Sequence, residues 1–262
     1  MKNIDLTTAF EEWAKPEYAY EWDPIGYQWG NPEAECTGIV VALDLTTEVV
    51  RHAQEIGANL IVTHHPTWFS PVRKLLTTSA TDALALETIA AKISVYAAHT
   101  NLDAAPDGVS VAYAKSLLPE AGMDFLQELE EGEGGFGVII TLEDEWSLEE
   151  LAEHCKLQWG FIPQNLTDYA SPAHFGKVAS KVFRQIAFWG GSWDENLVDL
   201  LKQKGVDLLF AGEVKWHSEL EMREEGILCV PTGHGQSEAW ILPIVQEKLE
   251  DIVAERLPVS VK

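Results

Sequence analysis

Basic side chains are scarce in this sequence. Lysines and arginines total 18 against 42 aspartates and glutamates, so the formal net charge is −24 at pH 7. Proteins that bind nucleic acid or anionic membranes non-specifically need a basic surface, and the charge therefore argues against both classes. An acidic, solubilising surface is the simplest interpretation, and it leaves room for a locally basic site.

Cysteines and long apolar runs are also few. The three cysteines, Cys36, Cys155 and Cys229, are widely spaced and form no CxxC pair, as expected for reduced thiols in a cytosolic protein. No apolar run reaches the roughly 18 residues that a membrane-spanning helix needs, and residues 1–10 lack the apolar core of a signal peptide. We therefore expect a cytoplasmic protein with no membrane partner.

Strand and helix signals alternate through the first half of the chain. Residues 38–44 read as a buried strand, followed by a helix that Thr46 or Thr47 caps and Gly57 ends. The apolar run 60–62 comes next and ends in His64 and His65. Short connections of this kind predict parallel strands joined by right-handed crossovers.

The same pattern returns in the second half. A helix ended by Gly205 precedes a strand that ends at Gly212, just as a helix ended by Gly57 precedes the strand that ends at His64. We infer an internal duplication. The predicted fold class is α/β, with two α/β units, mostly parallel strands and a small middle insertion.

An acidic, glycine-rich stretch at residues 128–137 marks a candidate domain boundary. We predict a first α/β half over residues 1–128, a middle segment or subdomain over 129–182, and a second α/β half over 183–262. Each half then carries part of the chemistry described next.

Five side chains that suit a metal ion follow predicted strand ends: His64, His65, Asp103, His234 and Glu238. The carboxyl ends of parallel strands share one edge of a sheet. A helix that begins just after His234 would bring His234 and Glu238 to one ion. Imidazole with carboxylate suits Zn²⁺, Fe²⁺ or Mn²⁺ better than Ca²⁺ or Mg²⁺. Five ligands exceed the three or four of a single zinc site, which favours two metals.

Each of these residues also has a structural interpretation. Asp103 could cap a helix and Glu238 could favour a helix dipole. His64 and His65 would point to opposite sides of an extended strand, so both can bind only if the chain turns, which Pro66 favours. The coincidence of all five at strand ends favours metal binding. The remaining histidines are interpreted as structural or exposed: His52, His154 and His174.

Five segments resemble the Nif3-like family, whose bacterial members are called dinuclear metal-centre hexameric proteins or GTP cyclohydrolase I type 2 homologues. The segments, in order along nearly the whole chain, are residues 22–26, 63–66, 99–103, 212–217 and 233–238. The resemblance implies a Nif3-like two-domain α/β fold, a toroidal homohexamer with inward-facing metal sites, and a dinuclear centre. It assigns metal ligation to the same five residues.

The resemblance implies a GTP-hydrolysing, ring-opening activity for some members and partner binding for others. We expect a metal-dependent hydrolase that acts on a nucleotide or related small molecule and uses two divalent ions, Zn, Fe or Mn. Glu213 or His217 would move protons, and His99 would orient Asp103. The alternative is a non-catalytic metal-binding scaffold or regulatory protein. A nuclease or phosphatase is less favoured, because no basic groove is visible.

Overall fold

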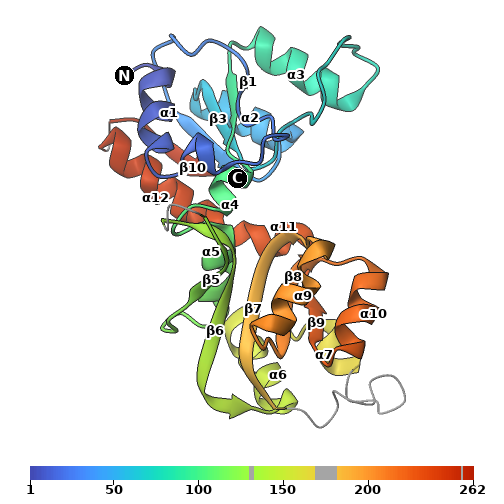
Figure 1. Ribbon diagram of the computed structural model, residues 1–262. Helices are drawn as coiled ribbons and strands as arrows, with labels where there is room; N and C mark the ends of the chain where they lie inside the picture. Colours follow the sequence, from blue (N-terminus) through green and yellow to red (C-terminus); the bar gives the residue numbers. More distant parts are fainter. Residues whose placement is uncertain (130–132, 169–181, 255) are drawn as a thin grey trace. The chain divides into compact units, whose positions relative to one another are not determined.

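The computed structural model describes residues 1–129, 133–168, 182–254 and 256–262 (Figure 1). The chain forms two compact units, of which the first comprises Met1–Ala105 and Ile241–Lys262 and the second Pro106–Trp240. Each unit is built on one five-stranded sheet. In the described residues, no helix combines the length and the apolarity needed to cross a bilayer.

The first unit contains a mostly parallel sheet in the order β1-β4-β3-β2-β10. Its strands are β1 (Gly26–Trp29), β2 (Ile39–Ala42), β3 (Leu60–Thr63), β4 (Ser94–Ala97) and β10 (Val259–Val261). Only the pairing of β1 with β4 is antiparallel among these strands. Every residue of β2, β3 and β4 is buried, as expected for parallel strands covered on both faces.

Helices of the first unit are α1 (Asn3–Glu11), η1 (Pro16–Tyr18), α2 (Thr47–Ile56), α3 (Ala80–Ala90), α4 (Thr100–Asp103) and α12 (Leu242–Val253). The predicted ends of α2 are confirmed: the Thr46 side chain accepts a hydrogen bond from the Val49 amide, and Gly57 adopts a left-handed conformation with φ of 71°. These caps fix where α2 begins and ends in the connection from β2 to β3.

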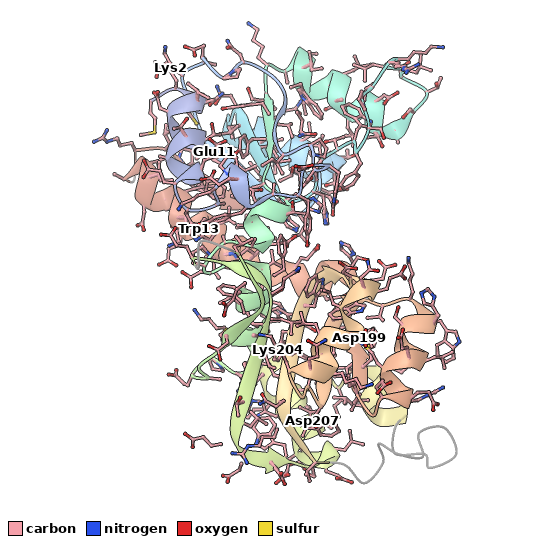
Figure 2. The ribbon with its side chains drawn as sticks, in the orientation of Figure 1. Lys2, Glu11, Trp13, Asp199, Lys204 and Asp207 are labelled. Carbon is pink, nitrogen blue, oxygen red and sulfur yellow. The ribbon has the colours of Figure 1, made fainter. Side chains whose placement is uncertain are left out.

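The C-terminal helix α12 packs against the N-terminal helix α1 (Figure 1). Trp13, labelled in Figure 2, lies just beyond the end of α1. Its ring lies edge-on to Phe10 at 5.5 Å between ring centroids, and the Lys248 ammonium lies 5.3 Å from it. This contact and the parallel pairing of β10 with β2 attach the end of the chain to the first unit.

The second unit contains a mixed sheet in the order β5-β6-β7-β8-β9. Its strands are β5 (Asp124–Glu128), β6 (Gly135–Trp146), β7 (Phe183–Ser192), β8 (Leu208–Glu213) and β9 (Leu228–Pro231). The pairings of β5 with β6 and of β6 with β7 are antiparallel, whereas β7, β8 and β9 run parallel. The carboxyl ends of β7, β8 and β9 therefore point the same way.

Helices of the second unit are α5 (Val109–Leu117), α6 (Leu148–Trp159), α7 (Gln164–Asp168), η2 (Glu195–Leu197), α9 (Val198–Gln203), α10 (Trp216–Glu224) and α11 (His234–Glu238), after which η3 (Ala239–Ile241) follows. The core is aromatic where α5 meets the sheet. Phe188 stacks on Phe210 at 5.1 Å, and Tyr113 meets Phe188 edge-on at 5.3 Å. This packing holds α5 against β7.

The unit boundaries differ from those predicted from the sequence. Residues 106–128 belong to the second unit, because α5 packs on β6 and β7, and β5 pairs with β6. Residues 241–262 return to the first unit. Within the predicted middle segment 129–182, strand β6 lies between β5 and β7 in the sheet of the second unit, and residues 130–132 and 169–181 lie outside the described part.

Candidate metal centre

Polar side chains follow three neighbouring strands of the first unit. The strands end in register, with Ala42 opposite Thr63 and Thr63 opposite Ala97. The polar residues beyond these ends are Asp44 after β2, His64 and His65 after β3, and His99 after β4. Because the ends are aligned, these side chains gather at one edge of the sheet.

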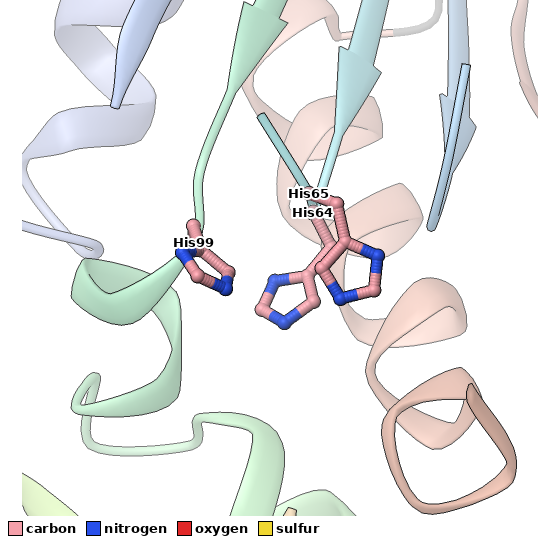
Figure 3. A group of neighbouring side chains, drawn as sticks. All are labelled: His64, His65 and His99. Carbon is pink, nitrogen blue, oxygen red and sulfur yellow. The ribbon is translucent and has the colours of Figure 1, made fainter. Parts of the chain in front are cut away.

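Three imidazoles form a cluster at this edge (Figure 3). The ring centroids of His64 and His65 are 4.9 Å apart. The ring centroid of His99 lies 5.2 Å from that of His64 and 5.6 Å from that of His65. Each ring offers a nitrogen within 4.8 Å of the nitrogens of the others. The strand ends at Thr63 and the chain bends at His64 and His65, so these sequence neighbours lie on the same side.

Hydrogen bonds fix the tautomers of His64 and His65. Nδ1 of His64 lies 2.9 Å from the Ala98 carbonyl oxygen, which can only accept, so Nδ1 carries the proton. Nδ1 of His65 lies 2.9 Å from Oδ1 of Asp44 and donates in the same way to the carboxylate. When such a ring is neutral, its lone pair is at Nε2, which is the arrangement of a metal-ligating histidine.

Asp23 fixes the third imidazole. Its buried carboxylate accepts hydrogen bonds from Nδ1 of His99 at 3.0 Å, and from the amide and hydroxyl of Thr100 at 2.9 Å and 2.5 Å. Burial alone would raise the pKa of Asp23, but the hydrogen bonds from His99 and Thr100 outweigh it and hold the pKa below its ordinary value. Asp23 is therefore an anion at neutral pH, and it orients His99 and the first residue of α4.

Asp103 ends the short helix α4 and lies close to the buried His64. Its amide donates to the His99 carbonyl oxygen at 3.0 Å, which fixes the turn. Oδ1 of Asp103 lies 3.7 Å from Nε2 of His64. Two donor atoms that bind one tetrahedral zinc at about 2.1 Å lie about 3.4 Å apart, so this spacing suits a shared ion.

A second group of predicted ligands lies in the second unit. His234 begins α11 and Glu238 ends it, as their spacing of four predicts. Nε2 of His234 lies 3.1 Å from Oε1 of Glu238, and its Nδ1 lies 3.4 Å from Oε2 of Glu213. Glu238 is buried whereas His234 is partly exposed. Imidazole and carboxylate thus converge at the end of β9.

Two glycines allow the sheet to approach α11. Gly191 has φ of 66°, and a Cβ atom placed on it would collide with Oε1 of Glu238. A Cβ on Gly212 would collide with the Ser237 hydroxyl oxygen. That hydroxyl accepts from the Gly191 amide at 2.9 Å and donates to the His234 carbonyl oxygen at 2.7 Å. The carboxyl ends of β7 and β8 therefore buttress α11, which carries both predicted ligands.

The residues predicted to transfer protons are placed differently from one another. Glu213 contacts His234, whereas Nε2 of His217 lies 2.8 Å from Oε2 of Glu195, which also pairs with Lys215 at 3.2 Å. Hydrogen bonds from His217 and Lys215 lower the pKa of Glu195. Within the described chain, no bond joins His217 to His234. The structure therefore gives Glu213, and not His217, a direct contact with a candidate ligand.

Sequence reasoning assigned no role to Asp23 or Asp44. Asp44 could have been found, because it follows a strand that the sequence predicts and that neighbours the strand of His65. Asp23 follows no strand, and only its place in the motif 22–26 points to it. The other histidines are structural where described: Nε2 of His52 lies 2.7 Å from the Ser260 hydroxyl oxygen and Nε2 of His154 lies 2.9 Å from the Leu117 carbonyl oxygen, whereas His174 lies outside the described residues.

The donor set fits a divalent transition metal. It consists of imidazole nitrogens and carboxylate oxygens, the set that Zn²⁺, Fe²⁺ and Mn²⁺ bind well. Carbonyl and carboxylate acceptors bind Nδ1 of His64, His65 and His99, which leaves Nε2 of each ring for ligation. The cluster of His64, His65 and His99 could therefore hold a metal ion.

Comparison with protein families gives a match over the whole chain. A family model described as Duf34/NIF3 (NGG1p interacting factor 3) matches residues 1–262. A protein of Lactococcus lactis subsp. lactis, named GTP cyclohydrolase 1 type 2 homolog, is 32% identical over 95% of this chain and 91% of its own length. A protein of the same name from Clostridium perfringens is 30% identical over 96% of this chain and 92% of its own length.

Solved structures share the fold. A Bacillus cereus protein related to NIF3 superimposes with a TM-score of 0.83 at 21% identity, covering 100% of this chain and 96% of that one. A Staphylococcus aureus protein superimposes with a TM-score of 0.84, also at 21% identity and with the same coverage. These similarities confirm the α/β fold predicted from the sequence.

Proposed function

The chain belongs to the Duf34/NIF3 family, and from that premise we propose that it is a metal-dependent hydrolase acting on a nucleotide or a related small molecule. The proposed metals are two divalent ions per subunit in a dinuclear centre. Their proposed ligands are His64, His65, Asp103, His234 and Glu238. The names of the relatives, GTP cyclohydrolase 1 type 2 homolog, support a purine nucleotide as the substrate to test first.

The observation that carries the proposal is the hydrogen bonding of the imidazoles. His64 and His65 each donate Nδ1–H to a fixed acceptor, so that Nε2 of each carries a lone pair. A carbonyl acceptor alone does not mark a ligand, because the structural His154 also bonds to one. His64 and His65 differ from His154 because their rings lie only 4.9 Å apart, in a cluster with His99. This arrangement lowers the cost of gathering several imidazoles around one cation.

Divalent ions, when bound, supply Lewis-acid polarisation of the substrate and lower the pKa of water. The protein's own residues orient the ligands and move protons. Asp44 stabilises the proton on Nδ1 of His65. Glu213 is exposed and contacts Nδ1 of His234, a position from which its carboxylate can accept a proton released during hydrolysis.

Turnover by metal-loaded protein tests the proposal. Purified protein reconstituted with Zn²⁺, Fe²⁺ or Mn²⁺ is incubated with GTP and other nucleotides, and the products are separated by liquid chromatography. We expect turnover with one of these metals, and its loss in His64→Ala. His52→Ala is the matched control, because His52 bonds to Ser260 and lies outside the cluster. Fully metal-loaded protein that turns over no nucleotide would contradict the hydrolase assignment.

A non-catalytic metal-binding scaffold or regulatory protein is the second candidate. Large apolar side chains on the surface favour it, among them Trp216 at 64% exposure and Leu157 at 76%. We propose a toroidal homohexamer in the cytoplasm for either function, and the three buried, unbridged cysteines suit that compartment. Light scattering after size exclusion tests the assembly, and a monomeric mass would contradict it.

A further inference from the structure

A pocket of about 720 Å³ opens in the first unit beside the histidine cluster. It is bounded by β1, by residues 68–75 of the segment between β3 and α3, and by Ile89 of α3. Its volume lies within the range of small-molecule sites. None of the proposed metal ligands lines this pocket.

Aromatic side chains form the walls of the pocket. Trp29 and Trp68 pack against each other, with ring centroids 5.2 Å apart and ring planes tilted by 53°. The indole N–H of Trp29 donates to the Thr88 hydroxyl at 2.8 Å, which fixes this ring against α3. Both indoles are half-buried, so each keeps an accessible surface. Such surfaces stack on planar rings, and nucleobases are a common example.

Two of the residues that line the pocket are cationic, and none of them is acidic. Arg73 and Lys74 line the pocket in a chain whose net charge is −24. In the part of the chain that the structure describes, neither forms an ion pair or a hydrogen bond with a carboxylate. An anion that enters here therefore meets two cations that form no ion pair within the described residues.

The pocket also borders the imidazoles. Phe69, one of its lining residues, packs edge-on to His99 with ring centroids 5.6 Å apart. Pro24, another lining residue, directly follows Asp23, which hydrogen-bonds to His99. A planar ring held against Phe69 would therefore lie one side chain away from the histidine cluster.

We propose that this pocket binds a purine nucleotide, with the base against the indoles of Trp29 and Trp68 and the phosphates at Arg73 and Lys74. This orientation places the base, rather than the phosphates, on the side of Phe69 and His99. The inference rests on the proposed function for its substrate class and adds where the substrate binds. The concave shape and the acid-free lining favour a small anion over a protein surface as the occupant.

Binding to metal-free protein tests the inference without any turnover. Chelator-treated protein is titrated by calorimetry with GTP, with guanosine and with inorganic triphosphate. We expect GTP to bind at least about tenfold more tightly than either fragment, because only GTP uses both the indoles and the cations. We also expect the affinity for GTP, but not for guanosine, to fall as salt is added.

Variants separate the two parts of the pocket. The double variant Arg73→Gln/Lys74→Gln should weaken GTP binding by about tenfold and leave guanosine binding unchanged. Trp68→Ala should weaken both ligands. The matched control is Arg51→Gln/Lys92→Gln, which removes the same charge from exposed positions outside this pocket. Its affinity for GTP should equal that of the wild type.

Three outcomes overturn the inference. One is that metal-free protein fails to bind GTP. Another is that Arg73→Gln/Lys74→Gln and its control Arg51→Gln/Lys92→Gln lose affinity for GTP equally. The third is that Trp68→Ala changes the oligomeric mass while the affinity for GTP stays the same, which would make the pocket a contact between copies of the chain. Intact GTP binding with no turnover by metal-loaded protein would instead contradict only the proposed function.

Discussion

The imidazole of His65 and the carboxylate of Asp44 form a hydrogen bond of 2.9 Å between Nδ1 and Oδ1. The two residues follow neighbouring parallel strands, and the aligned strand ends bring them together. A carboxylate on Nδ1 selects the tautomer, raises the basicity of Nε2 and fixes the ring plane. The bond therefore prepares His65 to bind a cation.

Replacing this carboxylate should weaken metal binding. Asp44→Asn keeps the size of the side chain but removes its charge, so Nε2 of His65 becomes less basic. We expect the metal affinity to fall about 10- to 100-fold, as is typical for such partners of ligating histidines. Competition against a chromophoric chelator measures the change. Asp251→Asn, an exposed substitution on α12, is the control, and equal affinities of the two variants would exclude this role for Asp44.

Alanine variants of two glycines distinguish the cost of backbone strain from the effect of displacing a metal ligand. Gly191 and Gly205 have similar φ angles, 66° and 68°, but only at Gly191 would a Cβ atom meet Glu238. Both alanine variants should lose about 1–2 kcal/mol of stability, because L-residues resist this conformation.

Only Gly191→Ala should also lose metal, because its methyl group displaces the Glu238 carboxylate. Chemical denaturation of the metal-free proteins measures the loss of stability, and elemental analysis of reconstituted proteins measures the metal content. Normal metal content in Gly191→Ala, with the stability loss present, would show that this glycine does not position Glu238.

The cysteines should be inert in the folded protein. Burial raises the pKa of all three thiols, Cys36, Cys155 and Cys229, above the ordinary value. The pKa of Cys155 rises to about 12. At about pH 8 all three thiols therefore stay protonated, and the thiolate is the reactive form. A thiol reagent should label none of them in native protein and all three in denaturant. Rapid labelling of native protein would contradict the buried positions.

Removing metal should lower thermal stability. A ligand that binds only the folded state stabilises it in proportion to the logarithm of one plus the ratio of its free concentration to its dissociation constant. Metal at about 100 times that constant therefore adds about 2.7 kcal/mol. The melting temperature of the wild type should therefore fall when a chelator is added. In His64→Ala the same chelator should change it little. An equal fall in both proteins would point to metal bound elsewhere.

The sequence predicts the local parts of the fold well. Thr46 and Gly57 mark the ends of α2, and the apolar run before His64 forms β3, because caps and apolar periodicity are local signals. The same holds for His234 and Glu238, whose spacing of four is realised in α11.

Pairing between distant segments is not local, and the sequence does not mark it. The glycine-rich stretch after Glu128 was predicted as a domain boundary, but Glu128 pairs with Gly135 in an antiparallel hairpin. The return of Val259–Val261 to β2 has no marker in the sequence either. Apolar patterns show that a strand is buried and do not show which strand it joins.

The metal content of the purified protein tests the central claim most directly. Elemental analysis by mass spectrometry should find two equivalents of a divalent transition metal per chain in the wild type and in His52→Ala. It should find a clear deficit in both His64→Ala and Glu238→Gln, whose side chains come from different units. Full metal content in either of these two variants, or none in reconstituted wild-type protein, would contradict the account.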